Sequence, residues 1–226
     1  MRPDDVVTFY QMCEFEQAGM LQKGMTFRPP PLHGIILMSQ RPNAPYADIL
    51  DDDGNLVYEG HDAPRTPVTP NPKTVDQPRR GENAKFADWT DRYRRAEVPP
   101  ARFHVYEKLI KGMWNFRGAF LLKDYRIEFS GGRDVFKFVL QAIDEPNGEA
   151  APLASAQEIA QTRQIPTWVK QEVYKRDRGR CVLCGATDQL HFDHDLPFSK
   201  GGASATPANV RLLCMRCNLS KGAKIE

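Results

Sequence analysis

Two pairs of cysteines near the end of the chain are the residues whose types and spacing point most clearly to chemistry. Cys181 and Cys184 form one C-x-x-C pair, and Cys214 and Cys217 form a second. In a protein of the cytoplasm, such pairs bind metal far more often than they form disulfides. Two knuckles of this kind bring four thiolates to one tetrahedral ion and leave no position open for catalysis. The sequence therefore predicts a structural zinc site, which would add folding energy to a segment with little apolar surface.

Polar residues whose side chains can act as bases or bind cations lie between and just after these pairs. Asp193 and His194 are adjacent, and Asn209 and Asn218 follow them. A neutral imidazole is a suitable general base near pH 7. Carboxylate and amide oxygens are ligands that suit Mg²⁺. Taken alone, an Asp-His pair is more often a pair of surface polar residues.

The order of these residues resembles the HNH nuclease family of the ββα-metal type, in its four-cysteine zinc branch. The family pattern is D-H-x-x-P, a downstream Asn and then C-x-x-C-N-x-x-K, and the resemblance covers about Trp168 to Ala223. It implies that His194 is the general base that takes a proton from the attacking water. It also implies that Asp193 and Asn218 hold one catalytic Mg²⁺ or Mn²⁺.

Other residues of this segment have supporting or open roles. The resemblance implies that Asn209 braces the loop carrying His194 and that Lys221 contacts phosphate. His191 points opposite to His194 by strand alternation, which favours packing or support of the site over catalysis. Asp195 replaces an apolar residue that is common after D-H in the family, so it either faces outward at the surface or tunes the metal site.

The charge of the chain is uneven. Its 226 residues carry 31 Lys and Arg against 29 Asp and Glu, a formal net charge of +2. Residues 165–226 are basic, and the remainder is slightly acidic. This division is typical of a phosphate-contacting module attached to a more selective one, although solvated surfaces explain the same charges. Because the sequence has no apolar run of ~18–20 residues and no signal-peptide pattern, we expect a cytoplasmic protein without a membrane partner.

The predicted elements divide the chain into two domains. Helices are predicted over Pro3–Met20, Asn83–Arg95, with Asn83 as its N-cap, and Thr167–Arg178. Strands are predicted over Gly34–Met38, two short runs between Tyr46 and Tyr58, Phe103–Ile110, Gly118–Phe129 and Asp134–Ile143, the last two joined by a turn at Gly131-Gly132. Helices that flank several non-local strands predict an α+β fold. The predicted domains are 1–145 and 165–226, joined by a linker over 146–164.

A second resemblance, covering about Gly34 to Leu140, concerns the first of these domains. The run Pro45 to Ile49, followed by the run Leu56 to Asp62, is similar to the core of SRA domains, as is Asp76-Gln77-Pro78. SRA domains read 5-methylcytosine by flipping it out of the duplex. The resemblance implies an SRA/PUA-like β-barrel-type domain with flanking helices, ahead of a small zinc-bound ββα-metal HNH domain. Such fusions resemble bacterial modification-dependent restriction enzymes.

Four residues of this second resemblance could form a pocket for a flipped base. Such a base needs aromatic faces, for which Tyr46 and Tyr58 are candidates, and hydrogen bonds on its Watson–Crick edge. Asp48 could accept from the exocyclic amine of cytosine. The second carboxylate of the family's acidic pair falls on Ile49, and Glu59 replaces a small hydroxyl residue, so the identity of the modified base stays open. Both tyrosines could equally be ordinary strand aromatics packed in a core.

Basic and amide residues outside the pocket are candidates for contacts with DNA. The loop Arg65–Arg80 carries several of them and could enter a groove or fill the gap left by a flipped base. It could also be a surface loop whose charge is merely favourable. The predicted DNA-binding residues are Arg79, Arg80, Asn83 and Lys221.

The two resemblances together predict a two-domain, Mg²⁺-dependent HNH endonuclease. It would recognise 5-methylcytosine or 5-hydroxymethylcytosine in double-stranded DNA and hydrolyse nearby phosphodiester bonds. Because one HNH site cuts one strand, a double-strand break favours a homodimer. Two other functions fit the same residues. The N-terminal domain could read another modification or a sequence, or the chain could bind modified DNA without cutting it.

Overall fold

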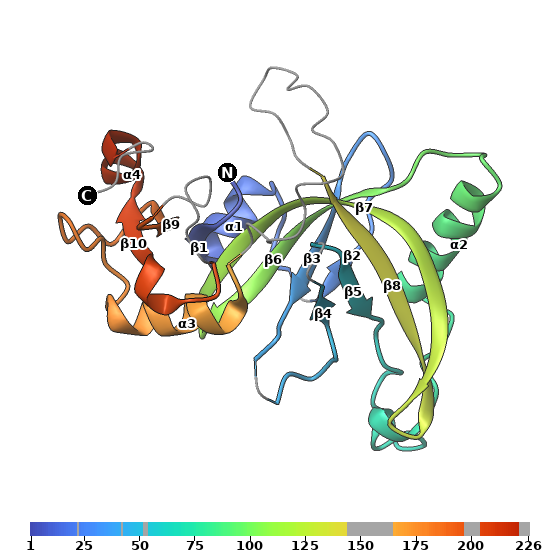
Figure 1. The fold of residues 1–226 in the computed structure, drawn as a ribbon. Helices are drawn as coiled ribbons and strands as arrows, with labels where there is room; N and C mark the ends of the chain where they lie inside the picture. The colour runs from blue at the N-terminus through green and yellow to red at the C-terminus, as the bar shows by residue number, and fades with distance from the viewer. Residues whose placement is uncertain (22, 42, 52–53, 144–164, 197–203, 222–226) are drawn as a thin grey trace. The chain divides into compact units, whose positions relative to one another are not determined.

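The computed structural model describes residues 1–21, 23–41, 43–51, 54–143, 165–196 and 204–221. Its helices and strands form a mixed α+β fold, which confirms the predicted fold class (Figure 1). The predicted linker over 146–164 lies outside the described residues. Within the described ranges, no helix is long and apolar enough to cross a membrane.

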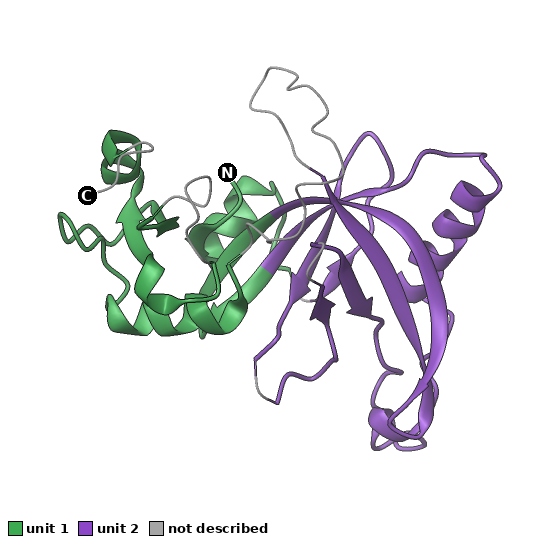
Figure 2. Cartoon of the chain, in the orientation of Figure 1, with its two compact units in different colours: residues 1–21, 107–117, 146–226 green, residues 22–106, 118–145 purple. Residues whose placement is uncertain are grey.

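The chain divides into two compact units, shown in green and purple in Figure 2. Unit 1 comprises residues 1–21, 107–117 and 146–226, and unit 2 comprises residues 22–106 and 118–145. Each unit is thus assembled from separated segments, whereas the sequence predicts two contiguous domains. The long strands β6 (Arg102–Ile110) and β7 (Met113–Ser130) each contribute residues to both units, which a linear division of the chain does not anticipate.

An antiparallel sheet forms the centre of unit 1. Strand β9 (Leu190–His194) lies between β10 (Val210–Cys214) and β1 (Asp5–Thr8). Strand β1 pairs on its other side with the first residues of β7. The strand that carries Asp193 and His194 is therefore held on both edges.

Short helices accompany this sheet. Helix α3 (Thr167–Arg176) begins after Pro166, as the sequence predicts, and α4 (Met215–Lys221) follows β10 directly. The turn η3 (Pro207–Asn209) leads into β10. The buried core of the unit is mainly aliphatic, and two of its buried members are Cys181 and Cys214.

The predicted helix over Pro3–Met20 is wrong at its start. Residues Asp5–Thr8 form β1, and helix α1 covers only Phe9–Phe15. The β-branched run Val6-Val7-Thr8 favours a strand. The Thr8 side chain then caps α1 in a reciprocal capping box with Gln11, which fixes the start of the helix.

Unit 2 is built mainly from antiparallel strand pairs. Besides its parts of β6 and β7, its strands are β2 (Met25–Thr26), β3 (Gly34–Met38), β4 (Ile49–Leu50), β5 (Leu56–Glu59) and β8 (Arg133–Ile143). Strand β5 pairs with β4 and with β8, and β8 pairs with β7. Gly131 and Gly132 form the predicted two-residue turn, with φ of 61° and 82°, which is the backbone that a type I′ hairpin requires.

Helix α2 (Glu82–Arg94) packs onto an aromatic core in unit 2. The Phe86 ring lies 4.5 Å from the ring of Phe103 and 5.1 Å from that of Phe138, measured between centroids. The N-cap of α2 is Gly81, not Asn83 as predicted. Asn83 lies in the first turn, where its side chain bonds to neighbouring loops instead of to its own helix.

Candidate functional site

The four cysteines of the two knuckles gather in unit 1. Their sulfur atoms all lie within 4.8 Å of one another, and the Sγ atoms of Cys184 and Cys214 are 3.6 Å apart. Zn–S bonds of ~2.3 Å in a tetrahedron place sulfur atoms ~3.8 Å apart, so the donor set fits zinc. A hydrogen bond to Cys214 raises the pKa of the Cys217 thiol to about 12. A bound cation would allow all four sulfurs to be thiolates.

Asp193 and His194 end strand β9, opposite Arg211 and Val210 of β10. The Nε2 atom of His194 lies 3.0 Å from the Ser204 hydroxyl, a contact that orients the imidazole ring. Both residues are partly buried. The carboxylate and the imidazole thus come from consecutive residues, whose side chains leave opposite faces of the strand, and β10 pairs with the backbone of both.

Asn209, predicted to brace the loop carrying His194, bonds to the segment directly after His194. Its side-chain oxygen accepts from the Leu196 amide at 2.8 Å, and its side-chain amide donates to the Leu196 carbonyl at 3.2 Å. Its backbone carbonyl accepts from the Asp195 amide at 2.8 Å. Because these bonds all go to backbone, they fix where the chain leaves the site.

Lys221 is placed inside this site and not on the surface. Its side chain is 1% exposed, and its ammonium lies 2.6 Å from Oδ2 of Asp193. It also donates to the backbone carbonyls of His194 and Asp195. The predicted phosphate contact therefore does not describe this geometry; Lys221 balances the Asp193 charge and ties α4 to the end of β9. Asn218 lies on the same helix and is partly buried.

Two further residues of this segment are placed by their partners. Asp195 lies 3.1 Å from Arg211, with 42% of its side chain exposed, which agrees with the outward-facing alternative. His191 is buried, and its Nδ1 lies 2.6 Å from Oδ1 of Asp5. The sequence gives no signal for Asp5, because its partner lies at the other end of the chain.

A pocket of about 560 Å³ opens in unit 2 beside the segment that leads from β3 to β4. Three of the four residues predicted for a base pocket, Tyr46, Asp48 and Glu59, line it. Tyr58 does not: its side chain is 1% exposed and belongs to the aromatic core, as the strand-aromatic alternative expects. Of the two tyrosines predicted to provide aromatic faces, Tyr46 therefore lines the pocket and Tyr58 does not.

Asp48 is a buried member of the pocket lining. Its two oxygens accept from the backbone amides of Ser39 and Glu59, each at 3.2 Å. Burial raises the pKa of this carboxyl to about 7, although the two amide hydrogen bonds oppose the shift. The group therefore changes charge near neutral pH.

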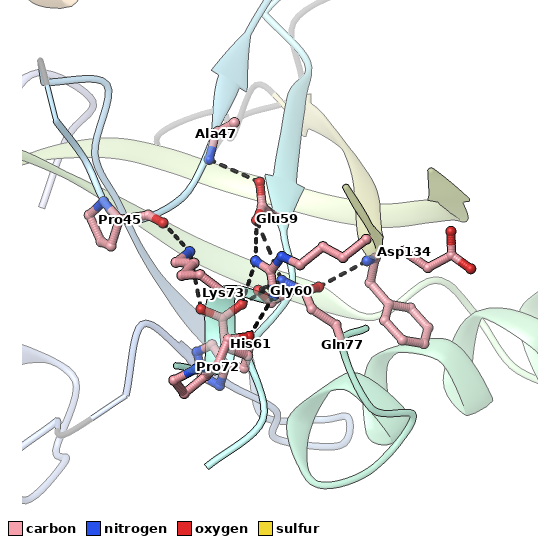
Figure 3. Close-up of polar contacts among 12 residues, drawn as sticks. Pro45, Ala47, Glu59, Gly60, His61, Pro72, Lys73, Gln77 and Asp134 are labelled. Atoms are coloured by element: carbon pink, nitrogen blue, oxygen red, sulfur yellow. Dashed lines mark hydrogen bonds and ion pairs between the residues drawn. The ribbon is translucent and has the colours of Figure 1, made fainter. Parts of the chain in front are cut away.

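Glu59 anchors a buried network of charges behind the pocket. Its carboxylate accepts from the Ala47 amide at 3.1 Å (Figure 3). It also lies 2.9 Å from the Lys137 ammonium and 3.5 Å from Arg133. Arg133 also lies 2.7 Å from Asp62. The network fixes the strand–loop segment that carries Tyr46 and Asp48. Lys137 and Arg133 were not predicted, because they come from β8 and their pairing depends on the tertiary fold.

Lys73 extends this network to the pocket itself. Its ammonium donates to the Pro45 carbonyl (Figure 3). It also lies 3.1 Å from Asp62 and 4.1 Å from the centroid of the Tyr46 ring. A cation at this distance over an aromatic face is attracted by the π electrons of the ring. Lys73 therefore holds Tyr46 in place.

The predicted DNA-binding residues of unit 2 differ in what they can contact. Arg79 is bound to Asp88 and Asp91, each at 2.7 Å, and to the Tyr125 hydroxyl. Asn83 is 1% exposed and bonds to the backbone of His61 and Pro78, so it supports the loop from within. Arg80 is exposed.

Comparison with known families defines the class of the C-terminal segment. Residues 181–224 match the model of the HNH endonuclease family. The match includes the four cysteines, Asp193, His194, Asn209, Asn218 and Lys221, and it confirms the predicted HNH domain. A comparison with curated proteins finds no match.

Solved structures similar to the chain include an SRA domain and restriction endonucleases. The SRA domain of SUVH5 in complex with hemi-methylated CG DNA is 21% identical and covers 68% of this chain and 94% of its own, with a TM-score of 0.45. The modification-dependent TagI restriction endonuclease is 15% identical and covers 97% and 76%, with a TM-score of 0.43. The type IV phosphorothioation-dependent restriction endonuclease ScoMcrA is 17% identical and covers 85% and 47%, with a TM-score of 0.36.

Proposed function

We propose that the protein is a modification-dependent DNA endonuclease. Unit 1 would hydrolyse phosphodiester bonds, and the pocket of unit 2 would take up a modified cytosine flipped from double-stranded DNA. The observation that carries the proposal is the arrangement at the end of β9, where Asp193 and His194 lie within the HNH-matched segment.

In the nuclease site, His194 would take the proton of the attacking water, with its ring oriented by Ser204. Asn209 would keep the backbone beyond His194 in place during the reaction. Asp193, through the carboxylate oxygen that Lys221 does not contact, and Asn218 would hold one Mg²⁺ or Mn²⁺, which would neutralise charge on the scissile phosphate and stabilise the leaving oxygen. Zinc bound by the four cysteines would be structural, because four thiolates leave it no open position.

In the pocket, Tyr46 would stack on the base and Asp48 would accept from the exocyclic amine of cytosine. The supporting observation is that both residues line one cavity, held by the Glu59 network. One nuclease site cuts one strand, so we propose that two copies of the chain make a double-strand break.

A second candidate keeps the nuclease and changes what unit 2 reads. The observation in its favour is the burial of Tyr58, which leaves the pocket without the second tyrosine face expected for a methylcytosine reader. A pocket with one tyrosine and a carboxylate of pKa about 7 could suit another modified base.

Matched duplexes test both candidates. The full chain is incubated with Mg²⁺ or Mn²⁺ and DNA carrying no modification, 5-methylcytosine, 5-hydroxymethylcytosine or N6-methyladenine. We expect cleavage of the two cytosine-modified duplexes. Preference for N6-methyladenine supports the second candidate, and equal cutting of all four eliminates a modification reader.

A variant of His194 tests its role as the general base. His194→Ala is expected to slow cleavage by ~10²–10⁴-fold while binding of modified DNA stays unchanged, because it removes only the proton acceptor. Full activity in this variant would exclude His194 as the base. If the wild type binds modified DNA selectively but cuts none of the duplexes, the chain is a reader without nuclease activity.

A further inference from the structure

The N-terminal strand β1 completes the sheet on which the nuclease residues lie. Asp5 and Val6 of β1 pair with His191 and Leu190 of β9, and Val6 also lies opposite Asn115 of β7. Slipping a strand by one residue turns every side chain to the other face of the sheet. The pairing with β1, together with the longer pairing with β10, therefore sets which way the side chains of β9 point.

Two adjacent carboxylates anchor this N-terminal segment to unit 1. Asp4 is bound to the ammonium of Lys170, a residue of α3 that is 0% exposed and lies 2.6 Å from Oδ1 of Asn115. The Asp5 carboxylate contacts Nδ1 of His191 at 2.6 Å, and these two side chains are 13% and 8% exposed. The Asp5–His191 contact joins the start of the chain directly to the strand that carries Asp193.

The His191 ring lies beside Asp5 at one nitrogen and is buried at the other. The Asp5 carboxylate lies at ion-pair distance from Nδ1, and Oδ1 of Asp5 makes no hydrogen bond among the residues that the structure describes. The His191 Nε2 is buried and has no hydrogen-bond partner among the residues that the structure describes. Because residues two apart on a strand share a face, His191 lies on the same side of β9 as Asp193.

We propose that Asp5 and His191 form a positioning pair of the nuclease site. Asp5, supplied by the first strand of the chain, contacts the His191 ring and pairs with the β9 backbone, and through β9 it supports the position of Asp193, whose carboxylate Lys221 contacts directly. The nuclease module then includes residues that precede the DNA-reading segment in the sequence. This inference rests on the proposed function, since it concerns the metal ligand of the same site.

Isosteric variants of the full chain test the pair. Asp5→Asn keeps the shape of the side chain and removes its charge, and His191→Gln removes the ring. Cleavage of a modified duplex gives kcat and KM, and Mn²⁺ titration followed by electron paramagnetic resonance gives metal affinity without any need for cleavage. Glu14→Gln, at an exposed position of α1, is the matched control for loss of a carboxylate from the same segment.

The pair predicts a specific set of results. Each variant is expected to lower both Mn²⁺ affinity and kcat by ~10–100-fold, as for partners that support metal ligands, while KM and DNA binding stay unchanged. Asp5→Glu should recover part of kcat. The double variant should be no worse than either single one, because both remove the same interaction. Glu14→Gln should match the wild type.

Other results would overturn the proposal. If Asp5→Asn lowers only the melting temperature and leaves kcat and Mn²⁺ affinity at wild-type values, the pair is a structural contact. Additive losses in the double variant would show that the two residues act separately. A wild-type chain that cuts no duplex refutes the proposed function instead, and Mn²⁺ affinity still decides whether Asp5 and His191 position Asp193.

Discussion

The two units hold their candidate sites by different physical means. Unit 2 places its pocket on an extensive buried core rich in aromatic rings, and a network of buried ion pairs fixes the pocket wall. Unit 1 has a smaller, mainly aliphatic core, and two of its buried members are metal-binding cysteines. Its strand of nuclease residues depends on contacts from distant segments of the chain. The comparison indicates that unit 2 should tolerate loss of metal, whereas unit 1 should not.

Removal of zinc should therefore cause the largest difference in stability between the two units. Cys214→Ser, or treatment with a strong chelator, is expected to unfold unit 1, because a small module of this kind draws much of its folding energy from the metal. Hydrogen exchange should show loss of protection in β9 and β10 with protection retained in β5 and β8. Cleavage should be lost and binding of modified DNA retained.

Cys13→Ser is the matched control for this change, since Cys13 is a partly buried cysteine of unit 1 outside the four-sulfur cluster. It should leave zinc content and exchange unchanged. A metal-free Cys214→Ser chain with full protection in β9 and β10 would contradict a structural role for zinc.

Breaking the charge network should have the opposite effect on the two units. Glu59→Ala leaves the buried cations Lys137 and Arg133 without their shared carboxylate. Loss of one partner of a buried ion pair costs about 3–5 kcal/mol, so we expect unit 2 to be destabilised by that amount while unit 1 keeps its zinc. Denaturant unfolding followed by hydrogen exchange in each unit measures this.

Glu128→Ala removes the same side chain from an exposed pair with Arg126 on β7. An exposed ion pair contributes ~0–1 kcal/mol, so this control should unfold close to the wild type. Equal losses for the two variants would show that burial of the network does not decide its contribution.

Features set by local sequence were predicted well. The metal knuckles, the Gly131-Gly132 turn and helix α3 each depend on residues that are near neighbours in the chain. The HNH pattern likewise lies within one short segment, so its residues could be identified without knowledge of the fold.

Features set by distant partners were not predicted. Strand β1 is stabilised by its pairing with β7 and β9, and its own residues do not indicate which strands it pairs with. Arg133 and Lys137 are ordinary strand residues until β8 pairs with β5 and brings them to Glu59. Tyr58 has the residue type that a stacking face needs, but packing of the core places its ring away from the pocket lining.

The smallest expected effect concerns pH and would sharpen the role of the pocket. Asp48 has a pKa of about 7 in the folded chain, and Glu59 and Lys137 are the charged groups that act on it. The ionised carboxylate offers both oxygens as hydrogen-bond acceptors, whereas protonation turns one of them into a donor. We therefore expect the ionised form to bind the exocyclic amine of cytosine more strongly. Binding of modified DNA should therefore strengthen by up to about tenfold between pH 6 and pH 8, in proportion to the ionised fraction.

The same titration has a defined sign for stability. Because the folded pKa lies above the ordinary value of 3.8, the folded chain binds more protons between these two values. The contribution of Asp48 to the free energy of unfolding then falls as pH rises from about 4 to about 7.

Asp48→Asn, which cannot ionise, should bind modified DNA with an affinity that does not change between pH 6 and pH 8 at constant salt. If the variant keeps the wild-type pH dependence, another group controls binding and Asp48 does not contact the base.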